Sequence, residues 1–287
     1  MSAFEIVETP LSDEARGARL FKGALLVHRR CPETDRLSLH VDALLREAFA
    51  PNDPELAHET LSTDALLEAV VKARDAVASA SRSAELFADF LAGVGADVDA
   101  TFWDKLTLRV LPPDGDRARG PAAPVGFHRD TWASRIAAQV NWWSPIRAVE
   151  RERTFAIYPS YFARPIANAS ATWDPMEYLR ARGEVSATAP VPYPIVPLTS
   201  EPVDRASETR VVIDPGDVLA FSSAHLHASL PNTTNRVRFS IEVRTVSLHD
   251  LERDAGAPNV DGVTGGERWH WYRQIRTGRS LVDVLAG

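Results

Sequence analysis

The sequence predicts a mainly β protein, an antiparallel barrel or sandwich with flanking helices on its N-terminal side. Two observations lead to this class. Up to about residue 103 the apolar residues recur with the period of a helix, whereas beyond it they alternate in short runs. Loops rich in proline and glycine, rather than helices, separate these short runs. That order is typical of antiparallel β architectures and not of a doubly wound parallel sheet.

The N-terminal part begins with an apolar run at 20–30 that reads as a strand, and a helical zone follows it. The clearest helical pattern lies within 62–95. Its apolar residues return to one face of a helix: Leu66, Val70, Ala73 and Val77. Ser62 is a candidate N-cap for this helix, and Gly93 is a candidate stop.

The part of the chain after residue 103 supplies the strands. Residues 105–111 alternate between apolar and polar side chains, as a strand with one buried face does. Four further runs have strand character: 137–146, 154–159, 218–222 and 238–246. We expect the aromatic tail at 266–285 to be helical and to pack over the barrel, with the lining of a pocket mouth as the second interpretation.

Length and composition favour one soluble globular domain that spans residues 1–287. The charged fraction of 25% and the hydrophobic fraction of 45% are ordinary for such a domain, and no apolar run is long enough for a membrane span. The N-terminus lacks a secretory signal, and a lone Cys31 forms no internal disulfide, so a cytoplasmic location is expected. A net charge of −7 gives no support for a nucleic-acid partner.

Residues 128–130 read His-Arg-Asp, a triplet found in two unrelated kinds of active site. In a protein kinase the Asp is the catalytic base, but an Asn must then follow five positions later, where this chain has Arg135. The glycine-rich phosphate loop of kinases is missing as well, so this interpretation is rejected. The second kind is a mononuclear metal site, in which the His and the Asp of such a triplet are both ligands. His128 and Asp130 could serve in this way, because alternate residues of an extended segment point to the same side.

A third ligand has to come from elsewhere, and residues 211–245 are the convincing source. They contain His225 and His227, and each is followed eleven residues later by an arginine, so spacing alone leaves both histidines open. Two imidazoles and one carboxylate leave three adjacent positions on iron(II), which suit a 2-oxo acid and oxygen. The far carboxylate of 2-oxoglutarate calls for an arginine, and Arg238 with Ser240 on the same strand face supplies a fitting pair.

The His-Arg-Asp triplet, the segment GDVLAFSSAHLHASLPN at 216–232 and the Arg-Phe-Ser at 238–240 together resemble the phytanoyl-CoA dioxygenase-like branch of the iron(II)/2-oxoglutarate-dependent oxygenases. The resemblance covers roughly 105–245 and is weak over the N-terminal helices. It implies a core that is a double-stranded β-helix, the jelly roll of cupin-like proteins, with flanking helices.

The resemblance also implies roles for single residues. His128, Asp130 and His227 match the iron ligands, since the family's second histidine stands before a small residue and five positions before an Asn, as His227 does. Arg238 matches the anchor of 2-oxoglutarate, with Ser240 assisting. Gln139 and Asn141 lie on one face of the strand after the triplet, which in the family often supplies a polar contact near the chelating end of 2-oxoglutarate, although a polar strand edge explains them equally well. His225 and Arg236 are left with structural roles.

We therefore expect an iron(II)/2-oxoglutarate-dependent dioxygenase that uses O2 to oxidise an unactivated C–H bond of a small metabolite, amino-acid-like or secondary. Hydroxylation is the default outcome, with desaturation or cyclisation as variants, and halogenation is disfavoured because Asp130 is present. One alternative is a cupin-like zinc or manganese hydrolase or isomerase with the same three ligands, which would not need Arg238 and Ser240. Another is a ligand-binding jelly roll with a degenerate metal site. Neither nucleic acid nor membrane is an expected partner.

Overall fold

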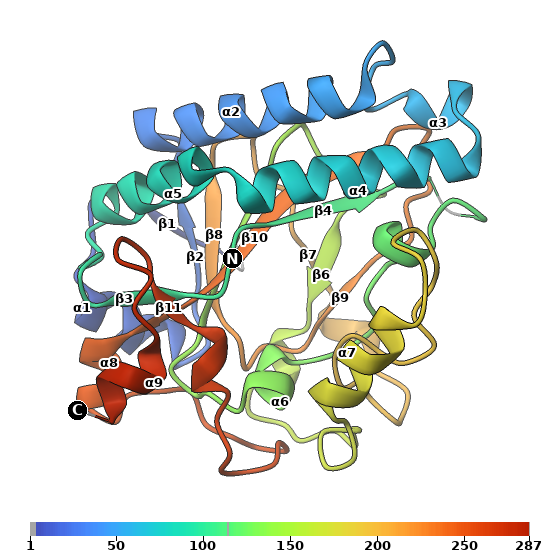
Figure 1. Cartoon of the computed structure of the whole chain (residues 1–287). Helices are drawn as coiled ribbons and strands as arrows, with labels where there is room; N and C mark the ends of the chain where they lie inside the picture. Colours follow the sequence, from blue (N-terminus) through green and yellow to red (C-terminus); the bar gives the residue numbers. More distant parts are fainter. Residues whose placement is uncertain (1–3, 114, 287) are drawn as a thin grey trace.

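The computed structural model describes residues 4–113 and 115–286, and shows a sheet-rich chain with a layer of helices (Figure 1). The helices are α1 (Asp13–Leu20), α2 (Pro32–Phe49), α3 (Ala57–Thr60), α4 (Thr63–Ser79), α5 (Ser81–Gly93), α6 (Asp130–Ser134), α7 (Pro175–Gly183), α8 (Leu248–Glu252) and α9 (Leu281–Leu285). The strands are β1 (Glu5–Val7), β2 (Leu25–His28), β3 (Thr101–Trp103), β4 (Thr107–Leu111), β5 (Val140–Pro145), β6 (Phe155–Ile157), β7 (Thr209–Arg210), β8 (Val218–Ser222), β9 (His227–Ser229), β10 (Arg238–Ser247) and β11 (Arg273–Gln274).

The strands form two sheets. The large sheet has the order β1-β2-β8-β5-β10-β3-β11, and β4 also pairs with β10. The small sheet has the order β7-β6-β9. Because β1 and β2 are parallel while the other pairs are antiparallel, the large sheet is mixed.

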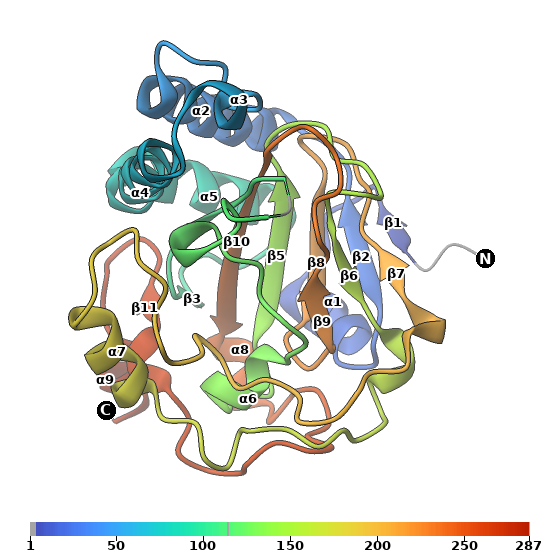
Figure 2. The ribbon, with the colours of Figure 1, turned by 90° about the vertical axis from the view of Figure 1, so that its right-hand side faces the viewer.

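The helical period predicted before residue 103 is confirmed. The zone at 62–95 forms α4 and α5, which meet at Ala80, and the Ser62 hydroxyl caps α4 by accepting a hydrogen bond from the Ala65 N–H. The buried residues of α4 include the predicted stripe: Leu66, Val70, Ala73 and Val77. Helices α2, α4 and α5 lie together on one side of the large sheet, and α6 and α7 lie away from this layer (Figures 1 and 2).

Strand β10 has one face toward the helical layer and the other toward a pocket, because alternate residues of a strand face opposite ways. On one face, Phe239 lies against Phe49 of α2, with ring centroids 5.6 Å apart. The opposite face carries a polar series that lines a pocket: Arg238, Glu242 and Arg244, with the buried Ser240 between them. The alternation predicted for this strand therefore places its polar residues together.

Two sequence-based expectations for single segments are wrong. Within 20–30 only Leu25–His28 is a strand, because α1 runs to Leu20 and a turn follows it. The tail at 266–285 is not one helix. Strand β11 adds to the large sheet beside β3, and α9 is a single short turn of helix. The tail does pack over the core, as expected, since Tyr272 is buried and Trp269 and Trp271 lie against core residues.

Over the part of the chain that the structure describes, no helix combines the length and the apolar character needed to cross a membrane.

Candidate metal centre

The structure brings His128, Asp130 and His227 together although Asp130 and His227 lie 97 positions apart in the sequence. Each offers one donor atom, and these three atoms lie within 4.8 Å of one another. The Asp130 carboxylate lies 3.6 Å from His128 Nε2 through one oxygen and 3.8 Å from His227 Nε2 through the other. Two nitrogens and one oxygen at this spacing form a suitable donor set for a divalent metal ion.

A backbone bridge between two segments positions the two histidines. The N–H of each histidine donates to the carbonyl of the other at 3.0 Å, which forms an isolated antiparallel bridge next to the small sheet. The extended backbone predicted for the triplet continues through Arg129, and α6 begins at Asp130. Alternation across 128–130 therefore directs both ligand side chains to one site, as expected.

Hydrogen bonds orient both imidazoles for metal binding. His128 Nδ1 lies 2.7 Å from the Gly126 carbonyl oxygen, and His227 Nδ1 lies 3.0 Å from the His225 carbonyl oxygen. Donation from Nδ1 fixes the tautomer that leaves the Nε2 lone pair free to bind a metal. Burial and the neighbouring His128 lower the pKa of His227 to about 4, so its imidazole is neutral at physiological pH.

The Asp130 carboxylate is held from two sides. Asn141 of β5 donates from its amide nitrogen to one oxygen, and Arg244 of β10 lies 3.4 Å from the other. Burial alone would raise the pKa of Asp130, but the Arg244 guanidinium and the two imidazoles hold it well below its usual range. The carboxylate is therefore ionised, as a metal ligand must be. Asp104, which binds Arg244 Nε at 2.6 Å, keeps that guanidinium in place.

Arg238 and Ser240 are buried polar residues with unpaired hydrogen-bonding atoms. Arg238 is 5% exposed and lines the same pocket as the three donor residues. Its Nε and Nη1 atoms and the Ser240 hydroxyl have no hydrogen-bond partner within the described chain. Burial and the neighbouring Arg109 lower the pKa of Arg238 to about 10, which leaves it charged at neutral pH. Because buried charges are nearly always paired, this pattern indicates a site for an anion.

Gln139 lies behind the pocket rather than in its wall. Its amide donates to the Asn141 side chain at 3.3 Å, and its oxygen accepts from the Tyr272 hydroxyl at 2.6 Å. Asn141, in contrast, lines the pocket. A hydrogen-bonded series thus runs from Tyr272 of the tail through Gln139 and Asn141 to Asp130, and a contact of Gln139 with 2-oxoglutarate stays a prediction.

His225 and Arg236 lie outside the pocket lining. His225 is completely buried, its ring lies tilted against Phe162 with centroids 4.5 Å apart, and burial lowers its pKa to about 3. Arg236 lies at the surface and pairs with Glu55 at 3.5 Å. These surroundings agree with the structural roles expected for both residues.

Sequence reasoning did not identify Asp261, whose carboxylate binds the middle residue of the triplet, Arg129. Its carboxylate accepts from Arg129 Nη2 at 3.1 Å and from the Trp132 indole nitrogen at 2.7 Å. Arg129 also donates to three backbone carbonyls, those of Tyr161, Arg164 and Ala224. The sequence around Asp261 is a polar, glycine-rich loop, and nothing in it indicates this partner.

The pocket itself is small and has both polar and apolar walls. It encloses about 550 Å³ including its opening. Its polar wall consists of the His-Asp-His donor set, Asn141 and the polar face of β10, and its apolar wall includes Val125, Phe155 and Phe221. Glu242 in this wall is neutralised by Arg109 of β4 at 2.6 Å. The unpaired Arg238 is therefore the charge in the wall that is available to a ligand.

Comparison with known proteins gives structural neighbours only. No family model and no curated protein matches the chain. EvdO2 from Micromonospora carbonacea var. aurantiaca is 14% identical, with 90% of this chain and 97% of that chain covered, at a TM-score of 0.46. SnoN, a non-heme alpha-ketoglutarate-dependent epimerase from nogalamycin biosynthesis, is 16% identical, with 82% and 83% covered, at 0.42. The carbocyclase SnoK from the same biosynthesis is 14% identical, with 92% and 98% covered, at 0.40. All three TM-scores lie below 0.5.

Proposed function

We propose that this chain is an iron(II)- and 2-oxoglutarate-dependent oxygenase that oxidises an unactivated C–H bond of a small organic substrate. The observation that carries the proposal is the unpartnered guanidinium of Arg238 in the same small pocket as a His-Asp-His donor set. A metal site alone fits many reactions. A metal site with a buried, unpaired cation beside it fits a reaction whose co-substrate is a dianion that chelates the metal.

His128, Asp130 and His227 would hold iron(II). The donor set fits, because both Nε2 atoms are free and the carboxylate is ionised. When bound, iron(II) supplies the redox chemistry that couples conversion of 2-oxoglutarate to succinate and CO2 with oxidation of the substrate by O2. Asn141 and Arg244 keep the carboxylate of Asp130 oriented toward the two imidazoles.

Arg238 would receive the distal carboxylate of 2-oxoglutarate, with the Ser240 hydroxyl donating a further hydrogen bond. Both groups lie on the polar face of β10, and their unmet hydrogen-bonding capacity is what a carboxylate supplies. The apolar wall of the pocket excludes water and so strengthens this charge pair. In this arrangement Gln139 acts on the co-substrate through Asn141, because its own side chain is already hydrogen-bonded.

The proposal includes the fold, a double-stranded β-helix in which both sheets contribute residues to the site. The small sheet carries His227 on β9, and the large sheet carries Asn141 and Arg238 on β5 and β10, so residues of both sheets converge on one site. This convergence supports a double-stranded β-helix of the phytanoyl-CoA dioxygenase-like type. A single domain over residues 1–287 and a cytoplasmic location stay predictions.

Hydroxylation is the proposed outcome, with desaturation or cyclisation as variants of the same chemistry. Halogenation is not proposed, because the buried and ionised Asp130 fills the position that a halide would need. The alternative of a zinc or manganese hydrolase or isomerase is less well supported. It gives no reason to bury Arg238 and Ser240 without partners.

The test measures co-substrate binding and turnover separately. Metal-stripped protein is loaded with manganese(II), and 2-oxoglutarate binding is followed by calorimetry. The protein is then loaded with iron(II) and ascorbate, and succinate formed from 2-oxoglutarate is quantified. We expect metal-dependent binding and succinate formation. A wild-type protein that binds manganese(II) but neither binds 2-oxoglutarate nor forms succinate would contradict the proposal and favour the hydrolase or isomerase alternative.

A further inference from the structure

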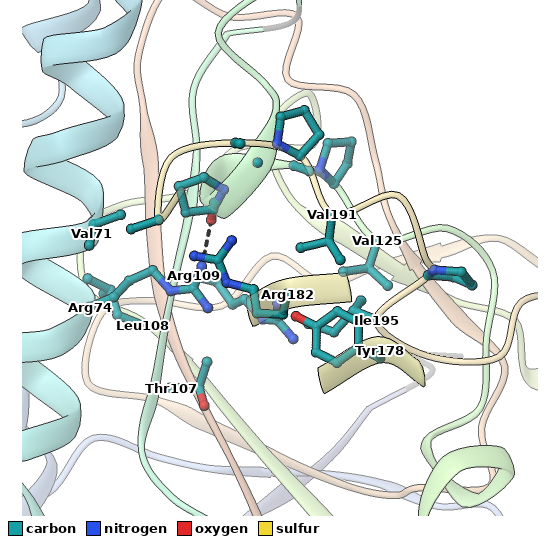
Figure 3. A pocket seen from close by; sticks show the side chains of 18 of the residues that line it. Val71, Arg74, Thr107, Leu108, Arg109, Val125, Tyr178, Arg182, Val191 and Ile195 are labelled. Atoms are coloured by element: carbon teal, nitrogen blue, oxygen red, sulfur yellow. Dashed lines mark hydrogen bonds between the residues drawn. The ribbon is translucent and has the colours of Figure 1, made fainter. Parts of the chain in front are cut away.

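A second, larger cleft lies beside the pocket that contains the His-Asp-His donor set, here called the metal pocket. Figure 3 shows side chains that line this cleft. The cleft encloses about 1550 Å³ including its open mouth. Its walls come from α4, β4, residues 120–126, α7 and residues 187–198. Arg109 and Val125 line both the cleft and the metal pocket, so the two spaces are neighbours.

The charge of the cleft has the opposite sign to that of the whole chain. The chain has a net charge of −7, yet the charged residues that line the cleft are four cations and one acid: Arg74, Lys105, Arg109, Arg182 and Asp75. Arg109 is paired with Glu242 and contributes little net charge. Arg74, Lys105 and Arg182 form no ion pair with any described carboxylate within 4.0 Å.

Two of these cations are held in place by backbone groups that do not neutralise them. Arg74 Nη1 donates to the Pro121 carbonyl at 2.9 Å, and Arg182 Nη1 donates to the Ser186 carbonyl at 2.9 Å. Figure 3 shows Arg74, Arg109 and Arg182 reaching into the same space from α4, β4 and α7. Burial and the nearby Arg109 lower the pKa of Arg74, because burial and a neighbouring positive charge both disfavour the protonated guanidinium. The guanidinium groups are thus positioned but not neutralised.

The remaining walls of the cleft are mostly apolar. They include Tyr178 of α7 and a series of aliphatic side chains: Val71, Leu106, Leu108, Val125, Val191, Ile195 and Leu198. Ligand sites typically combine such apolar walls with a few charged groups that orient the ligand. A ligand that fits this cleft therefore has an apolar body and a negatively charged group.

We infer that the cleft binds the substrate as an amphipathic organic oxyanion, with Arg74 and Arg182 at its charged group and its apolar body against the aliphatic wall. The inference rests on the proposed function, since the other end of the substrate then reaches the metal pocket past Val125. It narrows the small metabolite expected from the sequence, amino-acid-like or secondary, to one with a negatively charged group and an apolar body. An ammonium group would meet three unpaired cations in the cleft and a single acid, Asp75.

The experiment compares three probes with the same apolar body: 2-naphthoate, 2-naphthyl phosphate and the neutral 2-naphthamide. Binding is measured by calorimetry on protein loaded with manganese(II) and saturated with 2-oxoglutarate, so that Arg238 is occupied. We expect at least one anion to bind tenfold or more tightly than the amide, because hydrogen bonds to charged groups are the stronger ones. The anion that binds more tightly shows whether the cleft prefers a carboxylate or a phosphate group.

Two double variants assign that preference to the cleft. Arg74→Gln with Arg182→Gln should remove the preference for the anion and leave the affinity for 2-naphthamide unchanged, which also shows that the cleft is folded. Lys72→Gln with Arg180→Gln is the matched control, because both residues are exposed, lie on the same two helices and do not line the cleft. The control should keep the full preference.

Equal affinities for anion and amide in the wild type, no binding of any probe, or a preference that survives the Arg74 and Arg182 substitutions would each overturn the inference. The measurements are repeated on Arg238→Ala without 2-oxoglutarate. There the anion preference should persist. Failure of the 2-oxoglutarate site is thereby distinguished from failure of the cleft.

Discussion

Arg129 and Asp261 form a buried ion pair of 3.1 Å between residues that lie 132 positions apart. Arg129 stands between His128 and Asp130, so this pair connects the loop that contains Asp261 to the centre of the His-Arg-Asp triplet. Asp261 is not one of the three candidate metal donors, yet its partner Arg129 stands between two of them.

The first prediction concerns this pair. Asp261→Ala leaves the Arg129 charge buried without its partner, which should lower the free energy of unfolding by about 3–5 kcal/mol. Because the triplet loses its support, affinity for manganese(II) should fall as well. Urea unfolding with a chelator present and metal titration check the two effects. The exposed Asp283→Asn in α9 is the control. Wild-type stability in Asp261→Ala would refute the positioning role of Asp261.

The second prediction assigns the metal donors. Alanine at His128, Asp130 or His227 should reduce affinity for manganese(II) strongly, since each change removes a donor atom. His225→Ala should retain metal, although loss of its buried ring against Phe162 should destabilise the fold. Competition with a chromophoric chelator measures the affinities. Metal loss in His225→Ala with metal retention in His227→Ala would show that the wrong histidine was chosen.

The third prediction concerns the anchor of 2-oxoglutarate. Loss of a charge-assisted contact in a buried pocket costs about 2–4 kcal/mol, so Arg238→Ala should weaken 2-oxoglutarate binding roughly 30- to 1000-fold. Arg236→Ala, at the surface beside Glu55, should bind 2-oxoglutarate like the wild type. Calorimetry on the manganese(II)-loaded proteins gives both values. Equal affinities for Arg238→Ala and the wild type would exclude the anchor role.

The fourth prediction follows from the unpaired state of Arg238. In the absence of 2-oxoglutarate its guanidinium is a buried charge without a hydrogen-bond partner at Nε and Nη1. Arg238→Met should therefore leave the free energy of unfolding unchanged or raise it, by up to about 2 kcal/mol. With 2-oxoglutarate and manganese(II) present, the wild type should gain stability while the variant does not. Marked destabilisation of ligand-free Arg238→Met would indicate a structural rather than a ligand-binding guanidinium.

The fifth prediction concerns the dependence of stability on pH. Burial and the charge of Arg16 lower the pKa of His28 to about 4, below its ordinary value of 6.5. Between these two values the unfolded chain binds a proton that the folded chain does not, so stability falls as the pH is lowered from 6.5 to 4. The contribution of His28 is on the order of 3 kcal/mol.

His28→Leu removes this titration and leaves the other buried histidines in place. Urea unfolding at pH 6.5 and pH 4.5, in the presence of a chelator, should show a smaller loss of stability in the variant than in the wild type. The variant should also be at least as stable at pH 6.5, because the Nε2 atom of His28 is buried without a hydrogen-bond partner. Identical losses in both proteins would mean that His28 titrates normally in the fold.

Much of the secondary structure and the donor set could be read from local patterns in the sequence. The apolar stripe of α4 and the alternation in β10 are periodicities of neighbouring residues, and such periodicities survive folding because each element buries one face. The order His128, Asp130 and then His227 resembles a family pattern, and the structure brings these residues within 4.8 Å of one another.

The tertiary structure alone decided which distant residues meet. The pairing of β10 with β4 sets Arg109 beside Ser240, and the placement of α4 and α7 around one cleft brings Arg74 and Arg182 together. Within the tail expected to be helical, Arg273–Gln274 form a strand beside β3, because the edge of the large sheet offers backbone hydrogen bonds that local periodicity does not reveal. Charge pairing and strand pairing depend on the distance between two groups in space. The separation of two residues along the sequence does not reveal that distance.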